Sequence, residues 1–377
     1  MTHVCLGDVA REIKQKVPAG QELPTVGLEH LDPGEVELAH WDEGAETTFT
    51  KAFSRGQVLF GRRRAYLRKA AVAPFDGICS GDITVIAPKD NLSPRLLPFI
   101  IQNDALFEHA VTNSAGSLSP RVKWQSLSQF EFELPSIAKQ EDLADILWTA
   151  QETRSHYRQL LTACDDVVKS QFVEMFGDLR FENKLMPIRA LNEVASSRLG
   201  KMLDSKHQTG EWRRPYLTNR NVQWFRFDFQ EVNSMDFPPA DQKEFSLLPG
   251  DLLVCEGGEV GRCAIWRGQM KDCYFQKALH RVRCGNAIIP EYLCWWFKMM
   301  ADEGLLTRHA NTATIAHLSG VQLKQLGVLV PPLSLQQEFA DFAASVDKSK
   351  FAVQKALDEL NATTKKILNQ ELGLGDV

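Results

Sequence analysis

Two stretches decide how this chain is organised, LPSIAKQEDLADIL (134–147) and PPLSLQQEFADF (331–342). Each begins at or next to a proline, reaches a Gln-Glu pair a few residues later, and then enters an apolar pattern of helical period. A shift of 197 residues superimposes the shared residues, with Pro135, Gln140 and Glu141 falling on Pro332, Gln337 and Glu338. A repeat this long exceeds any solenoid period and predicts two related halves of domain size, each ending in a helix.

The two predicted helices carry apolar residues at seven-residue spacing. Four or more heptads of this kind favour a coiled coil, so we expect an intramolecular antiparallel pair; one long helix lying on its own globular domain is the alternative. Ser334 is expected to cap the second helix, with Gln337 at the capping-box position. The rows are Leu143, Ala150, Tyr157 and Cys164, then Ile146, Thr153, Leu160 and Val167, and in the second half Phe339, Val346, Val353, Leu360 and Ile367.

The remaining sequence alternates short apolar runs with turn residues and predicts strands with a few short helices, a mixed α+β fold. The repeat is expected to extend into these parts. With the shift of 197, GSLSP (116–120) falls on ATIAH (313–317), the same place although the letters differ. The fold expected is two similar globular domains separated by two long helices that form an antiparallel coiled coil. The expected boundaries are domain one at 1–135, the first helix at 136–177, a linker at 178–187, domain two at 188–332 and the second helix at 333–373.

Composition excludes several classes of protein. The 377 residues are 44% hydrophobic and 24% charged, which suits two or three domains with proper cores. No apolar run approaches the roughly 20 residues of a membrane helix, and the N-terminal MTHVCLGDVAREIK (1–14) lacks the apolar stretch of a signal peptide. We therefore expect a cytoplasmic protein without a membrane partner. The eight cysteines form no C-x-x-C pair, so buried reduced thiols are expected and no metal site is predicted.

Charge is unevenly distributed although the net charge is only −5. Residues 51–70 hold seven Lys and Arg and no acid, while residues 29–46 hold seven acids and no Lys or Arg. Arginine suits both guanine edges and phosphates, so GRRRAYLRK (61–69) is a candidate DNA-binding turn. A solvated basic loop or a docking patch for an acidic protein remains the alternative. The candidate residues here are Arg62, Arg63, Arg64, Tyr66 and Lys69.

The second half offers a different set of candidates. YLTNRNVQW (216–224) combines asparagine, which suits adenine, with arginine, although both types are also common in plain turns. A lysine after Gly200 suits a phosphate, and a polar group follows an aromatic strand, where base reading and an ordinary surface strand fit equally well. GGEVG (257–261) lacks the spacing of a phosphate-binding loop and predicts a hairpin that allows close backbone approach. The candidates are Lys201, Asn219, Arg220, Asn221, Arg262, Gln276, His280 and Arg281.

The ordered series of segments resembles the specificity subunit of type I restriction–modification systems over essentially the whole chain. No single motif is specific, but the series, duplicated around the predicted coiled coil, is. At the basic turn related domains tend to show Arg-Pro-Tyr-Leu, whereas this chain has Arg64-Ala65-Tyr66-Leu67. The segments that carry the resemblance are residues 6–34, GQVLFGRRRAYLRKAAVAPFDGICSGDITVIAP (56–88), SQFVEMFGD (170–178), LGKMLDSKHQTG (199–210), YLTNRNVQW (216–224), GDLLVCEGGEVGRCAIW (250–266) and the two Pro…Gln-Glu stretches.

The resemblance implies that each half is a target-recognition domain for one part of a bipartite site in double-stranded DNA. The helices would set the spacing and dock two methyltransferase subunits, with restriction subunits as further partners. S-adenosylmethionine, ATP and Mg²⁺ would then belong to those partners, and this chain would need no cofactor. Because GRRRAYLRK (61–69) and GGEVGRCAIW (257–266) differ, the site is expected to be asymmetric.

No catalytic residue is predicted. The chain lacks the Asn/Asp-Pro-Pro-aromatic motif of adenine methyltransferases, a P-loop, a G-x-S-x-G elbow and H-E-x-x-H. A coiled-coil scaffold whose two globular ends bind proteins is the rival interpretation, and a free-standing methyltransferase or nuclease is a weaker one. DNA binding that needs a methyltransferase partner would favour the specificity subunit over both.

Overall fold

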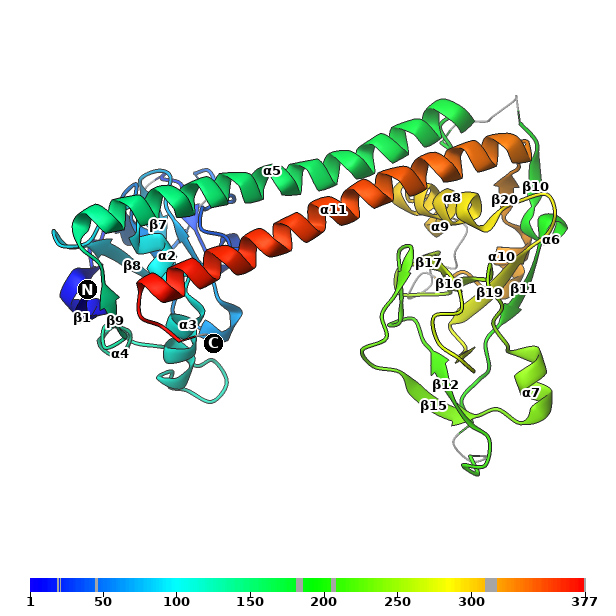
Figure 1. Cartoon of the computed structure of the whole chain (residues 1–377), viewed down its shortest axis with the longest axis horizontal. Helices are drawn as coiled ribbons and strands as arrows, with labels where there is room; N and C mark the ends of the chain where they lie inside the picture. The colour runs from blue at the N-terminus through cyan, green and yellow to red at the C-terminus, as the bar shows by residue number, and fades with distance from the viewer. Residues whose placement is uncertain are drawn as a thin grey trace. The chain divides into compact units, whose positions relative to one another are not determined.

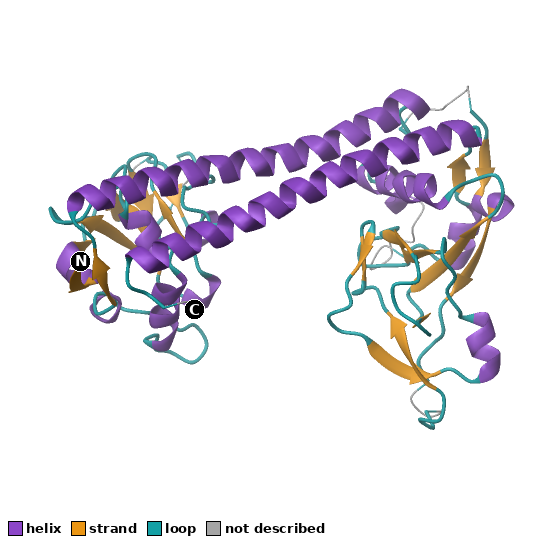
Figure 2. Cartoon of the chain, viewed as in Figure 1, coloured by secondary structure: helices purple, strands orange, loops and turns teal. Residues whose placement is uncertain are grey.

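A computed structural model describes residues 1–18, 20, 22–44, 47–180, 186–204, 208–308 and 317–375. The chain forms two compact units, one made of Met1–Leu160 with Ala352–Val377 and the other of Leu161–Phe351 (Figure 1). Each unit combines short strands with short helices and includes a part of both long helices (Figure 2). Within the described residues, no helix is both long enough and apolar enough to cross a membrane.

The first unit is built on a four-stranded antiparallel sheet in the order β2-β8-β5-β6, beside a three-stranded sheet β3-β7-β4 and the pair β1-β9. Its elements are β1 Thr2–Cys5, α1 Leu6–Val9, β2 Ala10–Ile13, β3 Thr25–Val26, η1 Leu28–His30, β4 Lys51–Phe53, β5 Val58–Gly61, η2 Ala65–Leu67, β6 Ala70–Val72, β7 Gly77–Cys79, β8 Ile83–Pro88, α2 Leu97–Ile101, α3 Asp104–Thr112, α4 Trp124–Leu127, β9 Glu131–Leu134 and α5 Ile137–Phe176, which continues into the second unit.

The second unit repeats this arrangement, with a four-stranded sheet β11-β19-β16-β17, a three-stranded sheet β15-β12-β18 and the pair β10-β20. A short hairpin, β13-β14, is added. Its elements are β10 Ile188–Ala190, α6 Leu191–Val194, β11 Ala195–Leu199, β12 Arg213–Leu217, β13 Val222–Gln223, β14 Arg226–Phe227, β15 Asn233–Asp236, α7 Pro239–Glu244, β16 Leu252–Cys255, β17 Cys263–Ile265, β18 Tyr274–Phe275, β19 Leu279–Cys284, α8 Pro290–Asp302, α9 Leu305–Arg308, α10 Gly320–Gln325, β20 Gly327–Leu329 and α11 Leu333–Glu371, which continues into the first unit.

The long helices α5 and α11 pack antiparallel, because each unit contains the beginning of one and the end of the other. In the first unit Leu143 and Leu147 of α5 share a buried cluster with Leu368 of α11. In the second unit the rings of Phe172 and Phe339 meet edge to face with centroids 5.4 Å apart. The predicted fold is therefore confirmed: mixed α+β, with two β-rich domains joined by two long antiparallel helices.

A buried glutamine fixes the start of each long helix. Gln140, 1% exposed, accepts from the Ser93 amide (2.8 Å) and donates to the carbonyl oxygens of Pro135 (2.9 Å) and Asn91 (3.2 Å). A side-chain amide suits this place because it can accept and donate at once, which leaves no polar atom unsatisfied. The first turn of α5 is thereby joined to the end of β9 and to the segment that leads into α2.

Gln336 makes the same three contacts in the second unit. It is 0% exposed, accepts from the Ile289 amide (2.9 Å) and donates to the carbonyl oxygens of Ala287 (3.0 Å) and Pro331 (2.7 Å). The structural equivalent of Gln140 is therefore Gln336, and the repeat aligns here with a shift of 196 residues. The predicted pairing with Gln337 is wrong by one position, because the sequence alone offers two adjacent glutamines.

Two details of the predicted helices also differ. Ser334 lies inside the first turn of α11, one residue past its start at Leu333, so it does not cap the helix. In α5 the first row is buried at Leu143 and Ala150 and half-buried at its other two members, whereas Ile146 and Val167 of the second row are 51% and 50% exposed. An antiparallel pair covers one side of each helix, and the second row of α5 lies on the side that the pair leaves open.

We predict that Gln336→Ala exposes the backbone that Gln336 now satisfies. Loss of the side-chain amide leaves buried donors and acceptors without partners, at about 1–3 kcal/mol for each group. Hydrogen–deuterium exchange in peptides covering residues 287–293 should accelerate, and the second unit should unfold at a lower urea concentration. The matched control is Gln337→Ala, since within the described part of the chain the exposed Gln337 side chain bonds to Asp341, one turn on and also exposed. Equal exchange in the two variants would contradict the assigned role.

Candidate nucleic-acid interface

The basic turn of the first unit connects β5 to β6 through the short helix η2. Arg64 and Arg68, which flank η2, both adopt left-handed backbone angles, with φ of +53° and +51°. This conformation turns Ala65 into the core at 2% exposure and leaves Tyr66 at 55% exposure. The backbone of Arg62 is fixed on both sides, donating to the Asp82 carbonyl (2.9 Å) and accepting from the Val122 amide (3.0 Å).

Asp82 anchors two arginines beneath this turn. Its carboxylate accepts two hydrogen bonds from Arg121, at 2.7 and 3.2 Å, and lies 3.5 Å from Nη1 of Arg63. The Arg121 hydrogen bonds hold the pKa of Asp82 below its ordinary value against the effect of burial, with further help from the charges of Arg63 and Arg62. Arg63 also donates to the Ser119 hydroxyl at 3.1 Å. Arg63 is therefore partly engaged within the protein.

The other predicted residues of this turn divide by their partners. Arg64 is exposed and, among the described residues, its guanidinium has no partner. Arg62 is half-buried, and its Nε has no hydrogen-bond partner within the described part of the chain. Lys69, by contrast, donates to the Leu28 carbonyl at 2.7 Å. Arg64 and Tyr66 are thus the predicted residues best placed to meet a ligand, with the Arg62 head group behind them.

In the second unit Asn221 and Asn219 hold their own turn together. Asn221 is 3% exposed, accepts from the Thr218 amide (2.9 Å) and donates to the Asp228 carbonyl (2.9 Å). Asn219 donates to the Gly257 carbonyl at 3.0 Å and receives a hydrogen bond from Arg262 on its own carbonyl at 2.9 Å. The structure gives Asn221 no surface for a base. Arg220, in the same turn, is exposed.

Two further candidates have partners within the protein, and only His280 is fully buried. His280 is 1% exposed, its Nε2 is 3.1 Å from the Leu318 carbonyl oxygen, and burial lowers its pKa. Arg281 donates to the carbonyl oxygens of Glu244 (3.0 Å) and Ser246 (2.7 Å) and covers the Phe275 ring at 5.6 Å. His280 is therefore a core residue. Arg281 stabilises the backbone at the end of α7 and just after it. The Gln276 side chain is half-buried.

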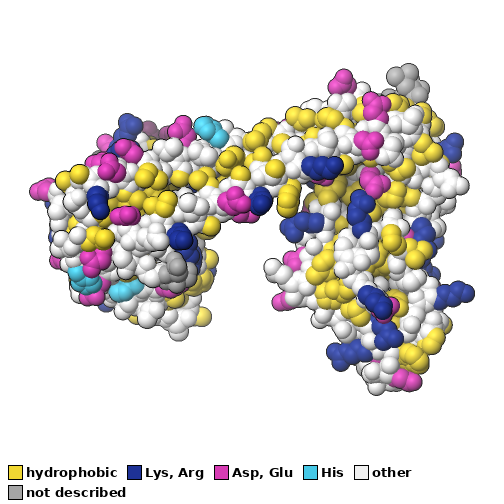
Figure 3. All heavy atoms as spheres, in the orientation of Figure 1, with side chains coloured by type: hydrophobic (Ala, Val, Ile, Leu, Met, Phe, Trp, Pro, Cys, Tyr) yellow, Lys and Arg dark blue, Asp and Glu magenta, His cyan; other side chains and the backbone are white. Residues whose placement is uncertain are grey.

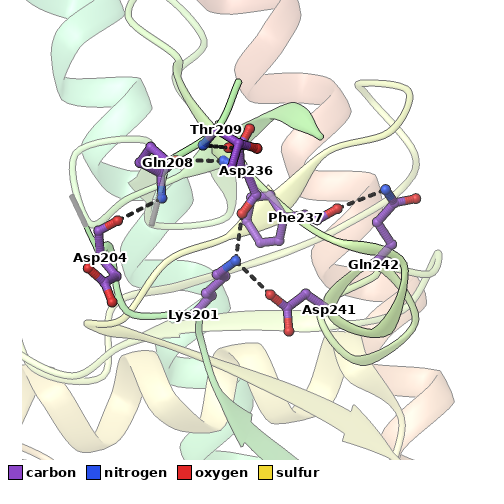
Figure 4. Close-up of polar contacts among 8 residues, drawn as sticks. All are labelled: Lys201, Asp204, Gln208, Thr209, Asp236, Phe237, Asp241 and Gln242. Carbon is purple, nitrogen blue, oxygen red and sulfur yellow. Dashed lines mark hydrogen bonds and ion pairs between the residues drawn. The ribbon is translucent and has the colours of Figure 1, made fainter. Parts of the chain in front are cut away.

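Lys201 also has internal partners, which Figure 4 shows. Its ammonium group lies 2.6 Å from Asp241 and 5.1 Å from the Phe237 ring centre, and it donates to the Asp236 carbonyl. The Asp236 carboxylate in turn accepts from the amides of Thr209 and Gly210. Burial alone would raise the pKa of Asp236, but these hydrogen bonds outweigh it and lower the pKa. The cluster joins the ends of β11 and β15 to α7, so the predicted phosphate contact of Lys201 would compete with it.

The four-stranded sheets of the two units carry different residues at one corresponding position, directly after β5 and β16. Glu256 replaces Arg62, because it donates to the Ala278 carbonyl and accepts from the Leu318 amide in the same pattern. The following loop is glycine-rich for a steric reason, since a Cβ on Gly257 would lie 2.7 Å from the His317 ring. The close backbone approach predicted for GGEVG is therefore an approach to another segment of the same unit, near His317.

Sequence reasoning did not identify several basic residues that the structure places at the surface. Arg121 joins the basic turn through Asp82, although it is distant from the turn in sequence. Arg213 and Arg226 are exposed in the second unit, and Figure 3 shows basic side chains gathered over β12 and β15. The sequence signal for these residues is that 198–226 hold seven Lys and Arg against two acidic residues. Residues 313–316, paired by sequence with the loop before Arg121, lie outside the described residues.

Comparison with known proteins agrees with the architecture. Residues 183–362 match the family model described as "Type I restriction modification DNA specificity domain". The EcoDI specificity subunit of a type I restriction enzyme from Escherichia coli is 23% identical over 146 residues, which are 36% of this chain and 32% of that protein. The match thus spans about a third of the length of this curated relative.

Solved structures resemble the whole chain in fold. A chain from a structure concerned with complex assembly and conformational transition of the type I R-M system has a TM-score of 0.64 at 17% identity, covering 100% of this chain and 98% of that one. The type I restriction–modification S subunit from M. genitalium has a TM-score of 0.57 at 12% identity, covering 100% and 96%. Specificity subunits of this family are non-catalytic. Residues 183–362 thus match the specificity domain of type I restriction–modification systems, and the whole chain shares the fold of the solved S subunit.

Proposed function

We propose that this subunit reads an asymmetric, bipartite target in double-stranded DNA, with one half-site for each unit. The observation that carries the proposal is that the same sheet position bears two different loops, an arginine-rich turn at 61–69 and a glycine-rich loop at 256–262 with Glu256 in place of Arg62. Different side chains recognise different base edges, so two unlike readers favour two unlike half-sites.

The residues proposed to contact DNA follow from exposure and free hydrogen-bonding capacity. In the first unit Arg64 and Tyr66 reach solvent, with Arg62 and Arg63 behind them for phosphates. In the second unit Arg220 is exposed in the turn after β12, and Arg213 and Arg226 add positive charge nearby. Cations of this kind supply affinity through phosphates, whereas one or two base contacts supply specificity. Asn219, Arg262, Lys69 and Lys201 are then supporting residues unless DNA displaces their internal partners, whereas Gln276 is half-buried.

The long helices are proposed to dock two methyltransferase subunits, with restriction subunits joining the complex in the cytoplasm. Large apolar side chains at high exposure along α5 and α11 support this, and Figure 3 shows hydrophobic side chains along the visible face of both helices. Exposed apolar surface on one element is a usual mark of a protein interface. S-adenosylmethionine, ATP and Mg²⁺ would be bound by the partners. The exposed side chains are Ile146 (51%), Leu160 (46%), Val167 (50%), Val173 (40%) and Phe351 (73%).

The proposal is tested by co-expressing the chain with its methyltransferase and mapping methylated adenines in the host DNA. A single motif with two defined segments around a spacer of fixed length is expected. Methylation without any bipartite motif would overturn the proposal. Binding of an acidic protein by the purified chain, with no DNA dependence, would instead favour a scaffold.

We predict that Arg64→Ala weakens or relaxes recognition of one half-site only. Loss of a base or phosphate contact costs about 1–3 kcal/mol, so binding to the target should fall roughly 5- to 150-fold. Bases of the other half-site should be discriminated as before. The readout is competition binding of the methyltransferase complex to duplexes mutated in one half-site at a time.

The matched control for Arg64 is Arg68→Ala. Arg68 flanks the same turn with the same backbone angle, but its guanidinium is paired with Asp104 and Glu108. It should change DNA binding far less. Equal loss at both half-sites in the Arg64 variant, with normal folding, would argue against separate readers.

We further predict that Val167→Asp weakens assembly with the methyltransferase. A charge placed in a buried apolar contact is costly, and loss of one central contact of 1–2 kcal/mol corresponds to roughly tenfold weaker binding. Val167→Thr, which keeps the shape of the side chain, should have a much smaller effect. Affinity is measured by titrating labelled methyltransferase, with circular dichroism as the folding check. Unchanged assembly in the aspartate variant would remove this surface from the proposed interface.

A further inference from the structure

The loop between α3 and α4 carries an unusually exposed leucine. Leu118 is 91% exposed, more than any other large hydrophobic residue in the described part of the chain. Single exposed leucines are common on protein surfaces, so exposure alone implies nothing. What distinguishes Leu118 is its position, because the loop that presents it is fixed to the basic turn of the first unit.

Several backbone and side-chain contacts hold this loop. Ala115 and Arg121 exchange two backbone hydrogen bonds of 3.0 and 2.9 Å, which close the loop at its base. The Arg64 amide donates to the Pro120 carbonyl at 2.8 Å, and Arg63 donates to the Ser119 hydroxyl at 3.1 Å. The loop is thereby joined on one side to the turn that carries Arg64. Leu118 stands at its tip, between Ser117 and Ser119.

The surroundings of Leu118 suit DNA better than an apolar protein partner. Arg63, Arg64 and Arg121 bring three guanidinium groups to this part of the unit, and Asp82 lies between Arg63 and Arg121. A DNA groove is bordered by two phosphate backbones. Cations beside an isolated apolar residue can bind these phosphates while the apolar residue enters the groove. The apolar group that the major groove offers is the C5-methyl of thymine.

We propose that Leu118 is a specificity-determining residue that contacts the C5-methyl group of a thymine in the half-site bound by the first unit. The inference rests on the proposed DNA-reading function and names a base contact that the basic residues cannot make. Contact with a methyl group fits the loop better than wedging between base pairs. A wedge must repay the cost of unstacking with a broad apolar surface, and the neighbours of Leu118 are serines.

The test replaces thymine by deoxyuridine, which removes only the methyl group, at each position of the mapped target in turn. Binding of the methyltransferase complex is measured by competition. The wild-type complex should lose about fourfold affinity at one thymine, the effect expected for one buried methyl group. Leu118→Ala should bind the thymine and deoxyuridine duplexes equally, with the rest of its specificity intact. Leu248→Ala, which removes a 50% exposed leucine of the second unit, should behave as wild type.

Each other outcome overturns the inference. A wild-type complex that is insensitive to deoxyuridine throughout the target, or a half-site without thymine, excludes the methyl contact while leaving the proposed function intact. A 2-aminopurine unstacking signal that disappears in Leu118→Ala, without sensitivity to deoxyuridine, would show a wedge instead. Retained thymine preference in the alanine variant assigns the preference to another residue. Failure of the complex to recognise any bipartite DNA target overturns the proposed function and this inference together.

Discussion

The architecture depends on one buried side-chain amide at the start of each long helix. Gln140 and Gln336 are almost fully buried, and each side chain accepts a hydrogen bond from one backbone amide and donates to two backbone carbonyl oxygens. An ionised glutamate at this place would have no N–H groups to donate. An apolar residue would leave three buried backbone groups without hydrogen-bond partners. Because the same contacts join the helix to the last strand and to the segment before α2 or α8, the direction in which each helix leaves its domain is fixed.

The second constraint is electrostatic and differs between the units. In the first unit Asp82 forms ion pairs with Arg63 and Arg121. Arg64 is exposed on a turn with left-handed backbone angles, next to the loop that carries Leu118. In the second unit the equivalent strand end carries Glu256 and glycines, and the exposed cations lie elsewhere. One sheet topology therefore supports two surfaces of different chemistry, which the proposed reading of two unlike half-sites requires.

Several polar residues that looked suited to bases instead hold the second unit together. Asn221 closes its turn, His280 is buried against Leu318, and Lys201 joins strand ends to α7. Asparagine, histidine and lysine serve equally well as internal hydrogen-bonding groups and as readers of DNA. Only burial and partners separate the two roles, and neither can be read from residue type.

The sequence by itself determined the duplicated plan, because proline, glutamine and heptads of apolar residues leave a periodic signal that needs no tertiary contact. It also located the basic turn of the first unit, since a run of arginines is a local property. Tertiary structure alone decided that Gln336, not Gln337, repeats Gln140, because adjacent glutamines differ only in burial. It likewise decided which cations are free, which row of α5 is covered, and that Leu118 stands beside Arg64. These outcomes depend on residues distant in sequence whose charges and surfaces meet only after the chain has folded.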